Sequence, residues 1–428
     1  MKKYQRPRGT LDLLPDYLEK WSYVENVWIK IVKRYNFQKI VTPIFENTDL
    51  FARTAGESSD IVTKEMYTFL DKGGRSLTLR PEGTAAVVRA YFENQLYTQM
   101  QPVKLFYLMP MFRYERPQAG RFRQHHQYGV ECIGERSPYI DTQVMSLFMD
   151  FYNELGVVEP IIWLNSLGCE ECRPAYKQML VNYLKDNSDK LCKQCNLRLE
   201  KNPLRVLDCK VDECHNYIDS APLIKDNLCV DCNEDFEQVK SLLDMQQVNY
   251  VISPMLVRGL DYYNRTVFEV AAKGVSSKDV IAGGGRYDSL IKEVGGVDSS
   301  AFGAGAGMER LIETLEMQGV NIPIKKDRKI AVITLNEEHN SFSYKFCQQL
   351  RDANLTAECF FNVKKIGNLL SKLGALSYCY AVILGEDEIS NGVVLVKNLN
   401  SRKQRSFSIN DIDNMINTFR FDTDPSYG

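Results

Sequence analysis

The segment at 111–131 carries four arginines around a Pro–Gly turn: Arg113, Arg116, Arg121 and Arg123. The guanidinium group is a planar fork of donors whose charge does not titrate away. Four such groups on one predicted strand–loop–strand indicate a polyanionic ligand, such as a polyphosphate or a nucleic-acid backbone. The alternative is a solvated basic hairpin, and for a lone arginine cluster that would be the better interpretation.

The return strand of this hairpin carries an amide and a carboxylate, Gln127 and Glu131, at even spacing. Even spacing places both side chains on the same face of a strand. A charged outgoing arm with a polar return arm argues against a hairpin that serves only as surface. We therefore expect a binding site beside the hairpin.

Several predicted elements must position this site. An amphipathic helix is expected at 17–35, a short strand at 77–80 and a further helix at 144–155. A strand is also expected at 37–45, where Pro43 requires either a kink or an edge position. After Pro81, a helix is expected to start at 82–84, with Thr84 as its N-cap, and to continue through Leu96. Strands are predicted again at 250–257 and 266–271.

Two glycine runs follow, at 283–285 and 303–307. Each superficially suggests a phosphate-binding loop, but the second run lacks the Lys-Ser/Thr that would complete a P-loop. We interpret both runs as places where the backbone closely approaches a ligand and packs before a helix.

Eight cysteines form four closely spaced pairs between 169 and 232: Cys169 and Cys172, Cys192 and Cys195, Cys209 and Cys214, and Cys229 and Cys232. A Cys-x-x-Cys loop offers two thiolates at the bite that tetrahedral zinc requires. The eight could hold two zinc ions, or four of them one. We expect any metal here to be structural. His215 could replace one cysteine as a ligand, although we favour its interpretation as a neighbouring surface histidine.

The bulk composition limits the class of protein. A chain of 428 residues should form two or three domains, and its 44% apolar and 25% charged residues are those of an ordinary globular protein. The net charge of −2 requires any nucleic-acid contact to come from local patches. We find no secretion signal and no apolar run of about 18 residues, so we expect a cytoplasmic protein with reduced thiols and no membrane span. Beyond Arg328, alternating strands and helices predict a small α/β domain.

Together these segments resemble the bacterial histidyl-tRNA synthetases, which are class II aminoacyl-tRNA synthetases. The similarity extends from 8–15 to the C-terminal domain. Residues 37–45 resemble the class II dimer motif, the arginine hairpin resembles the ATP-binding second motif, and 303–310 resembles the third. The stretches at 256–263 and 282–287 are similar to those specific to the histidine enzymes.

The resemblance implies an α+β fold, with an antiparallel sheet flanked by helices. It assigns 1–166 and 241–322 to the catalytic domain, 167–240 to a cysteine-rich insertion, and 329–428 to an anticodon-binding α/β domain. The implied enzyme is a homodimer that joins L-histidine to ATP, expels pyrophosphate, and transfers histidine to tRNA(His). The resemblance also implies that the insertion reaches over the acceptor stem of the tRNA. It implies that Arg116 and Gln118 lie near the acceptor end.

For the nucleotide, the resemblance implies that Arg113 and Arg258 contact the α-phosphate, where negative charge builds during activation. Arg121 and Arg310 are implied at the terminal phosphates with Mg²⁺, and Glu115 is the ATP-side carboxylate. Arg310 is also implied to cover one face of the adenine. His125 stands where many members have a stacking phenylalanine, and we expect this smaller, more polar ring to change ATP affinity or its pH dependence.

For histidine, the resemblance implies acceptors around the α-ammonium and one partner of each kind for the imidazole. The ammonium is assigned to Glu82, Thr84 and Gln127, beside Gly83, Arg113 and Arg258. The imidazole is assigned to Glu131, Tyr262, Tyr263 and Tyr287. A pocket of this kind rejects analogues that lack the ring nitrogens, because its own buried groups would be left unpaired.

Two rival interpretations remain at this point. One is a non-catalytic, synthetase-like regulatory subunit of the first enzyme of histidine biosynthesis, but such proteins lack the terminal domain and lose catalytic residues. The other is a class II synthetase for threonine or proline, and the Arg-Gly-Leu-Asp-Tyr-Tyr stretch that begins at Arg258 argues against it.

Overall fold

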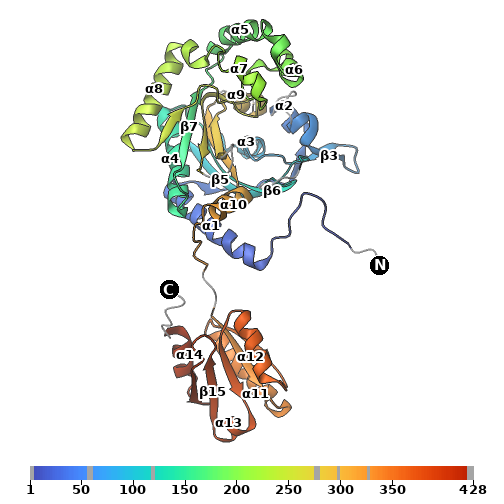
Figure 1. The fold of residues 1–428 in the computed structure, drawn as a ribbon, viewed down its shortest axis with the longest axis vertical. Helices are drawn as coiled ribbons and strands as arrows, with labels where there is room; N and C mark the ends of the chain where they lie inside the picture. Colours follow the sequence, from blue (N-terminus) through green and yellow to red (C-terminus); the bar gives the residue numbers. More distant parts are fainter. Residues whose placement is uncertain are drawn as a thin grey trace. The chain divides into compact units, whose positions relative to one another are not determined.

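A computed structural model describes residues 4–54, 61–116, 121–273, 280–295, 299–324 and 328–421. The chain divides into two compact units, Met1–Pro323 and Ile324–Gly428, each described here by itself (Figure 1). Among the described residues, no helix has both the length and the apolar character needed to cross a membrane.

The first unit is built on an eight-stranded sheet with the order β1-β5-β6-β11-β10-β9-β7-β8. Its strands are β1 (Gln38–Lys39), β5 (Val103–Phe112), β6 (Gln124–Ile133), β7 (Ile161–Ser166), β8 (Tyr250–Ile252), β9 (Asn264–Ala271), β10 (Val280–Arg286) and β11 (Ala301–Gly307). Edge strand β1 pairs in parallel with β5, and edge strand β8 pairs in parallel with β7. The six strands between these edges pair antiparallel with one another. This sheet confirms the predicted fold class.

Helices cover both faces of the sheet. One face carries α1 (Pro15–Arg34), α4 (Pro138–Leu155), α8 (Val230–Met245) and α10 (Met308–Met317), which share a core with β6, β9 and β11. Trp21, Val24, Trp28 and Ile31 lie inside that core because they recur every three or four residues along α1. The other face carries α3 (Thr84–Glu93) and α9 (Asp288–Gly295), and the candidate site lies on this side.

The strand predicted at 37–45 is divided in two. Its first part is β1, and its second part is β2 (Phe45–Asn47) in a small sheet with β3 (Tyr67–Leu70) and β4 (Ser76–Leu79). Pro43 has no N–H to donate to a neighbouring strand. The buried Arg80 guanidinium donates hydrogen bonds to the carbonyls of Thr42 at 2.7 Å and Pro43 at 3.1 Å. Helix α2 (Thr48–Thr54) and the π-helical turn η1 (Ile61–Glu65) complete this region.

Helix α3 starts differently from the prediction. Its N-cap position is Gly83, and the Glu82 carboxylate accepts from the amides of Thr84 at 2.6 Å and Ala85 at 2.9 Å. Thr84 is therefore inside the helix, because the preceding carboxylate already satisfies the exposed amides. The helix also ends at Glu93, and a short 3₁₀ turn, η2 (Leu96–Thr98), follows.

The cysteine-rich segment forms a helical subdomain with its own apolar core. It contains α5 (Cys172–Lys185), α6 (Lys193–Lys201), α7 (Asp212–Ile218) and the 3₁₀ turns η3 (Ser188–Lys190), η4 (Pro203–Val206) and η5 (Ile224–Asn227). Helices α5, α6 and α7 gather beyond the β7 side of the sheet in Figure 1. Helix α8 crosses the domain limit predicted at 240, and its residues Phe236, Val239 and Leu243 pack in the core of the large sheet.

The second unit is an α/β domain with a five-stranded sheet in the order β13-β12-β14-β15-β16. Its strands are β12 (Lys329–Thr334), β13 (Thr356–Phe360), β14 (Tyr378–Leu384), β15 (Val393–Asn398) and β16 (Gln404–Ser408). Its helical elements are η6 (Glu337–His339), α11 (Asn340–Asp352), α12 (Ile366–Ala375), α13 (Glu386–Ser390) and α14 (Ile412–Phe421). Strand β12 pairs in parallel with both neighbours, as the alternating pattern predicts.

Candidate active site

Two adjoining cavities lie on the α3 side of the large sheet. The larger has a volume of about 460 Å³ and the smaller about 210 Å³. Arg113 and Arg258 line both cavities, although 145 positions separate them in the chain. The arginine hairpin and the 256–263 stretch therefore meet at one place.

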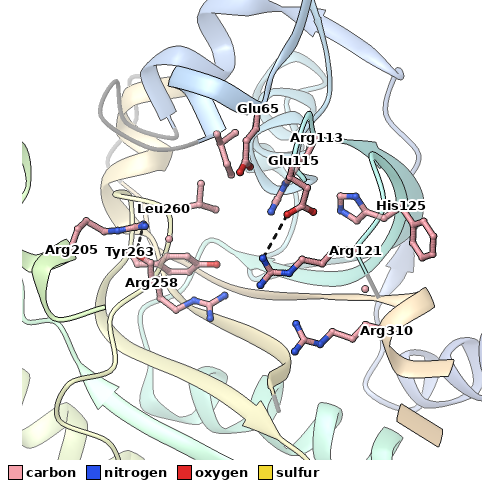
Figure 2. A pocket seen from close by; sticks show the side chains of 14 residues that line it. Glu65, Arg113, Glu115, Arg121, His125, Arg205, Arg258, Leu260, Tyr263 and Arg310 are labelled. Atoms are coloured by element: carbon pink, nitrogen blue, oxygen red, sulfur yellow. Dashed lines mark hydrogen bonds and ion pairs between the residues drawn. The ribbon is translucent and has the colours of Figure 1, made fainter. Parts of the chain in front are cut away.

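The larger cavity collects the side chains predicted for the nucleotide. Its lining includes Arg113, Glu115, Arg121, His125, Arg258 and Arg310. Figure 2 shows the guanidinium groups of Arg121, Arg258 and Arg310 directed toward a common space. Such a concentration of fixed positive charge suits a bound triphosphate.

The smaller cavity collects side chains predicted for the amino acid. Its lining includes Glu82, Thr84, Gln127 and Tyr262, besides the two shared arginines and His125 and Tyr263, which also line both cavities. The Gln127 Oε1 atom is buried and has no hydrogen-bond partner among the described residues. A buried acceptor without a donor is costly, so this amide oxygen is available for a ligand ammonium.

Each shared arginine is held by its own contacts. Arg113 donates from Nε to the Pro81 carbonyl at 2.8 Å, and its amide donates to the Arg123 carbonyl at 2.9 Å. Arg258 forms an ion pair with Glu269 of β9. Although burial alone would lower the pKa of Arg258, the Glu269 carboxylate raises it, so the guanidinium stays charged.

His125 is neutral in this site. Burial is the largest cause and neighbouring Arg113 the next, and together they lower the pKa of His125 to about 3. Its Nδ1 atom is buried without a partner among the described residues. The expected pH dependence therefore cannot arise from charging of this ring near neutral pH in the ligand-free protein. Its predicted effect on ATP affinity stays a prediction.

Glu131 and Tyr287 line neither cavity: Glu131 lies one hydrogen bond behind the smaller cavity, and Tyr287 lies behind Glu131. The Glu131 carboxylate is fully buried and accepts from the hydroxyls of Thr84 at 2.8 Å, Tyr287 at 2.5 Å and Tyr107 at 3.2 Å. Burial is the largest cause that raises the pKa of Glu131 to about 8. Of these partners, Thr84 faces the smaller cavity.

The glycines of β11 make room for the polar side chains of β6. Gly303 pairs with Glu131 and Gly305 pairs with Gly129 across the ladder. A methyl group on Gly303 would lie 1.8 Å from the Glu131 Oε2 atom, and one on Gly305 would lie 2.1 Å from the Gln127 Nε2 atom. The second glycine run thus leaves room for these two side chains, while the predicted approach of its backbone to a ligand stays a prediction.

Some predicted site residues lie elsewhere. Arg116 is exposed and lines neither cavity, and Gln118 lies outside the described residues. Arg123 stacks over the Tyr114 ring at 3.9 Å from its centroid, so it serves the hairpin and not the cavity. Gly83 also lines neither cavity, but a methyl group there would lie 2.5 Å from the Tyr107 ring.

Three residues of the site escaped sequence reasoning. Glu65 and Arg205 line the larger cavity. The Tyr107 hydroxyl donates to the Glu131 carboxylate and accepts from Gln127 Nε2. Tyr107 lies on β5 opposite Gly129 of β6, so the alternation of β5 could have indicated its direction. Arg205 lies among the cysteine pairs, where no local pattern points to the cavity.

The eight paired cysteines form two separate groups. The base cluster consists of Cys169, Cys172, Cys229 and Cys232, and the distal cluster consists of Cys192, Cys195, Cys209 and Cys214. Within each group the sulfur atoms lie within 4.8 Å of one another. In the base cluster, the Cys169 sulfur lies 3.6 Å from that of Cys172 and 3.7 Å from that of Cys229.

These spacings fit tetrahedral zinc, whose bonds of about 2.3 Å place the sulfur atoms roughly 3.8 Å apart. Backbone amides also point at the sulfurs, with Cys229 N 3.1 Å from Cys172 Sγ and Cys192 N 3.2 Å from Cys214 Sγ. Although burial alone would raise the pKa of Cys169, amide hydrogen bonds lower it to about 7. His215 belongs to neither cluster, since its nitrogens contact the Cys209 carbonyl and Asp219.

Comparison with known proteins bears directly on this site. The family model described as histidyl-tRNA synthetase matches residues 9–311, and the anticodon binding domain model matches 329–418. The chain belongs to the histidyl-tRNA synthetase family. This family activates histidine with ATP and Mg²⁺ and transfers it to tRNA, so its members are aminoacyl-tRNA synthetases, a class of ligases. The predicted family, ligase function and terminal anticodon-binding domain are therefore confirmed.

Individual relatives of this synthetase cover nearly the whole chain. A histidine–tRNA ligase from Halothermothrix orenii is 46% identical over 398 residues, which is 93% of this chain and 95% of that relative. One from Desulforamulus reducens is 45% identical over 95% of this chain and 97% of its own length. The crystal structure of apo S. aureus histidyl-tRNA synthetase covers 98% of this chain and 100% of its own, with a TM-score of 0.82 at 34% identity.

A more distant likeness concerns the first rival interpretation. A Bacillus halodurans structure titled as an ATP phosphoribosyltransferase regulatory subunit/histidyl-tRNA synthetase has a TM-score of 0.62 at 18% identity over 90% of this chain and 99% of its own. At that identity the likeness shows only a shared fold. The family match over 9–311 therefore outweighs it.

Proposed function

We propose that this synthetase forms histidyl-adenylate where its two cavities meet, with ATP in the larger and L-histidine in the smaller. One observation carries this proposal. The side chains assigned to ATP line the larger cavity and several assigned to histidine line the smaller, while Arg113, Arg258, His125 and Tyr263 line both and mark where the two meet. The reacting carboxylate and α-phosphate would then meet between these two arginines, whose fixed charge stabilises the transition state.

The remaining arginines of the larger cavity would hold the rest of the nucleotide. Arg121 and Arg310 are assigned to the terminal phosphates, with Arg310 also against the adenine, and His125 is assigned as the neutral platform for the base. Glu65 and Glu115 line this cavity and offer the carboxylate oxygens that suit Mg²⁺. When bound, Mg²⁺ offsets part of the triphosphate charge.

Histidine would be bound by hydrogen-bond acceptors and by hydroxyl groups. The α-ammonium is assigned to Gln127, Thr84 and Glu82, of which Gln127 supplies the buried oxygen without a partner among the described residues. Tyr262 and Tyr263 line the cavity from the side of the histidine-specific stretch. Glu131 and Tyr287 are assigned to the imidazole, and each would exchange a hydrogen bond of the ligand-free pocket for one to the ring.

The second step would transfer histidine to tRNA(His). Arg116, exposed on the hairpin, and Gln118 are assigned to the acceptor end, and the 167–240 insertion is assigned to the acceptor stem. The unit beyond 329 is assigned to the anticodon. We also propose that the enzyme works in the cytoplasm, where a reducing environment would keep its cysteines free of disulfide bonds.

Two further assignments concern assembly and metal. A homodimer would cover apolar side chains of the 41–45 segment, since Val41 is 68% exposed and Phe45 51%. Zinc would occupy the base and distal clusters, whose spacings fit four thiolates each. The limits 1–166 with 241–322, 167–240 and 329–428 remain our proposal for the three domains.

Histidine-dependent exchange of pyrophosphate into ATP tests the proposed function. The wild-type chain should catalyse it, and Arg113→Ala or Arg258→Ala should slow it by about 10²- to 10³-fold, the usual effect of removing one group that stabilises the developing charge. Arg123→Ala is the matched control, because this arginine stacks on Tyr114 outside the cavities. Absence of exchange, or exchange driven by threonine or proline, would refute the proposal.

A further inference from the structure

Arg205 brings the cysteine-rich insertion into contact with the active site. It lies in η4 (Pro203–Val206), between Cys195 and Cys209 of the distal cluster, yet its side chain lines the larger cavity. From Nη1 it donates to the Arg258 carbonyl at 3.3 Å. Figure 2 shows this side chain entering the site from the side opposite His125.

The backbone that carries Arg205 is held by the insertion. Leu204 and Val206, on either side of it, are buried in the same core as Cys195 and Cys209. The Cys209 amide donates to the Val206 carbonyl at 3.0 Å, and Arg198 Nη1 donates to the Arg205 carbonyl at 3.1 Å. The position of this turn therefore depends on how the distal cluster is tied together.

Strand β7 supports the start of the segment that receives Arg205, where Asn165 Nδ2 donates to the carbonyls of Pro254 and Leu256 at 3.0 Å each. Residues 253–263 form the connection between β8 and β9, so ladder hydrogen bonds do not fix the backbone around Arg258. The insertion supplies other contacts instead. Met255 and Val257 pack against its core, and Asn202 Nδ2 donates to Asp261 Oδ1 at 2.8 Å.

We propose that Arg205 is a positioning residue: it holds the backbone of Arg258 so that this guanidinium stays where the two cavities meet, and zinc in the distal cluster fixes Arg205 in turn. This inference rests on the proposed role of Arg258. An arginine suits the task because one N–H can bind a carbonyl while the guanidinium keeps its charge beside the nucleotide cavity. The insertion thereby acts on histidine activation, before tRNA takes part.

The first test replaces Arg205 in the full-length protein. Arg205→Ala should lower kcat of histidine-dependent pyrophosphate exchange by about 10- to 100-fold, because a displacement of about 1 Å at a reacting group can cost 10²-fold. Arg205→Lys, which keeps the charge and a donor, should recover part of the loss. Lys201→Ala removes an exposed charge just before the same turn and should stay within about twofold of wild type.

Hydrogen exchange of the backbone supplies the second readout. Arg205→Ala should speed exchange in peptides covering 254–263, and should leave peptides of α1 and α4 unchanged. Unchanged protection at 254–263, or pyrophosphate exchange within about twofold of wild type, would overturn the positioning role. If the wild type itself fails to exchange pyrophosphate, the proposed function fails, while protection at 254–263 still decides the positioning role.

The metal link is tested with a double-mutant cycle. Cys192→Ser should remove one zinc per chain, speed hydrogen exchange at 202–207 and slow pyrophosphate exchange in the wild-type background. The same substitution should add little to Arg205→Ala, since both would act through one contact. Cys229→Ser in the base cluster should instead add independently to Arg205→Ala. Additive effects of Cys192→Ser, or unchanged protection at 202–207, would overturn the link between metal and Arg205.

Discussion

The Thr84 hydroxyl donates to the Glu131 carboxylate at 2.8 Å, which joins the first turn of α3 to strand β6 directly behind the smaller cavity. Tyr287 and Tyr107 complete a set of three hydroxyls around the same carboxylate. The group assigned to the imidazole is therefore already satisfied before a ligand enters. Binding of an imidazole would therefore replace one of these hydrogen bonds by one to the ring, while the other two still hold the carboxylate in place.

Burial of Glu131 predicts a pH dependence of stability. Its pKa is raised from 4.5 to about 8, so the folded state binds the proton more tightly than the unfolded chain. This proton binding contributes a few kcal/mol to the free energy of unfolding. The contribution is fully present below pH 4.5 and is lost as the pH rises through about 8. Thermal unfolding of Glu131→Gln between pH 5 and 9 should show a flatter dependence, with exposed Glu316→Gln as control. An unchanged slope would contradict the prediction.

Gly283 of β10 should tolerate no side chain. A methyl group there would lie 2.3 Å from the Arg258 Nη1 atom, and the displaced guanidinium would leave the junction of the cavities. Gly283→Ala should therefore slow pyrophosphate exchange by about 10²-fold with little change in Tm. Gly367→Ala is the control, since nothing lies within 4 Å of that position in α12 and a methyl group there should stabilise the helix by about 0.5–1 kcal/mol. Normal kinetics of Gly283→Ala would show that Arg258 moves without consequence.

The two cysteine clusters predict two zinc ions per chain. Elemental analysis of protein purified without added zinc should find both, and Cys172→Ser should leave one. Cys347→Ser, which removes a buried cysteine outside both clusters, should leave two. Chelation should destabilise the insertion, because metal binding and folding are linked at thiolate sites. A metal content near zero, with an unchanged fold after chelation, would refute the assignment.

The proposed dimer predicts a monomeric variant. Ile44 is 47% exposed beside Val41 and Phe45, so Ile44→Asp should place a charge in a covered apolar surface and dissociate the subunits. Leu376→Asp makes the same change at an exposed leucine of the second unit and should leave the mass in solution unchanged. Sedimentation equilibrium measures both. A wild-type protein that sediments as a monomer would contradict the homodimer.

The hairpin predicts a separation of the two reaction steps. Arg116 is exposed and lies outside both cavities, so Arg116→Ala should leave pyrophosphate exchange within about twofold of wild type. Transfer of histidine to tRNA should slow by about tenfold, which corresponds to one lost charge-assisted contact of about 1.4 kcal/mol. Single-turnover transfer from preformed adenylate measures this step. Equal loss in both steps would place Arg116 in activation instead.

Local patterns predicted much of this fold. The three- and four-residue recurrence of Trp21, Val24 and Trp28 requires a helix with one buried face, and the structure confirms it in α1. The strand at 37–45 is interrupted around Pro43 and β1 lies at the sheet edge, as predicted, but the pattern did not reveal that its two parts join different sheets with Arg80 bound to the carbonyls between them. The predicted N-cap of α3, Thr84, was wrong because residue preference takes no account of the Glu82 carboxylate, which binds the Thr84 amide in the folded protein.

The order and types of residues in the chain were enough to assign the family and to name Arg113, Arg258 and Arg310 as partners. Only the tertiary structure showed that the site residues line two adjoining cavities and that Glu131 lies behind the smaller one. Only the tertiary structure also divided the eight cysteines into two clusters and placed the Arg205 side chain in the larger cavity. The reason is physical. Periodicity and motif spacing report neighbours along the backbone, whereas side chains from distant segments meet only after the whole core has packed.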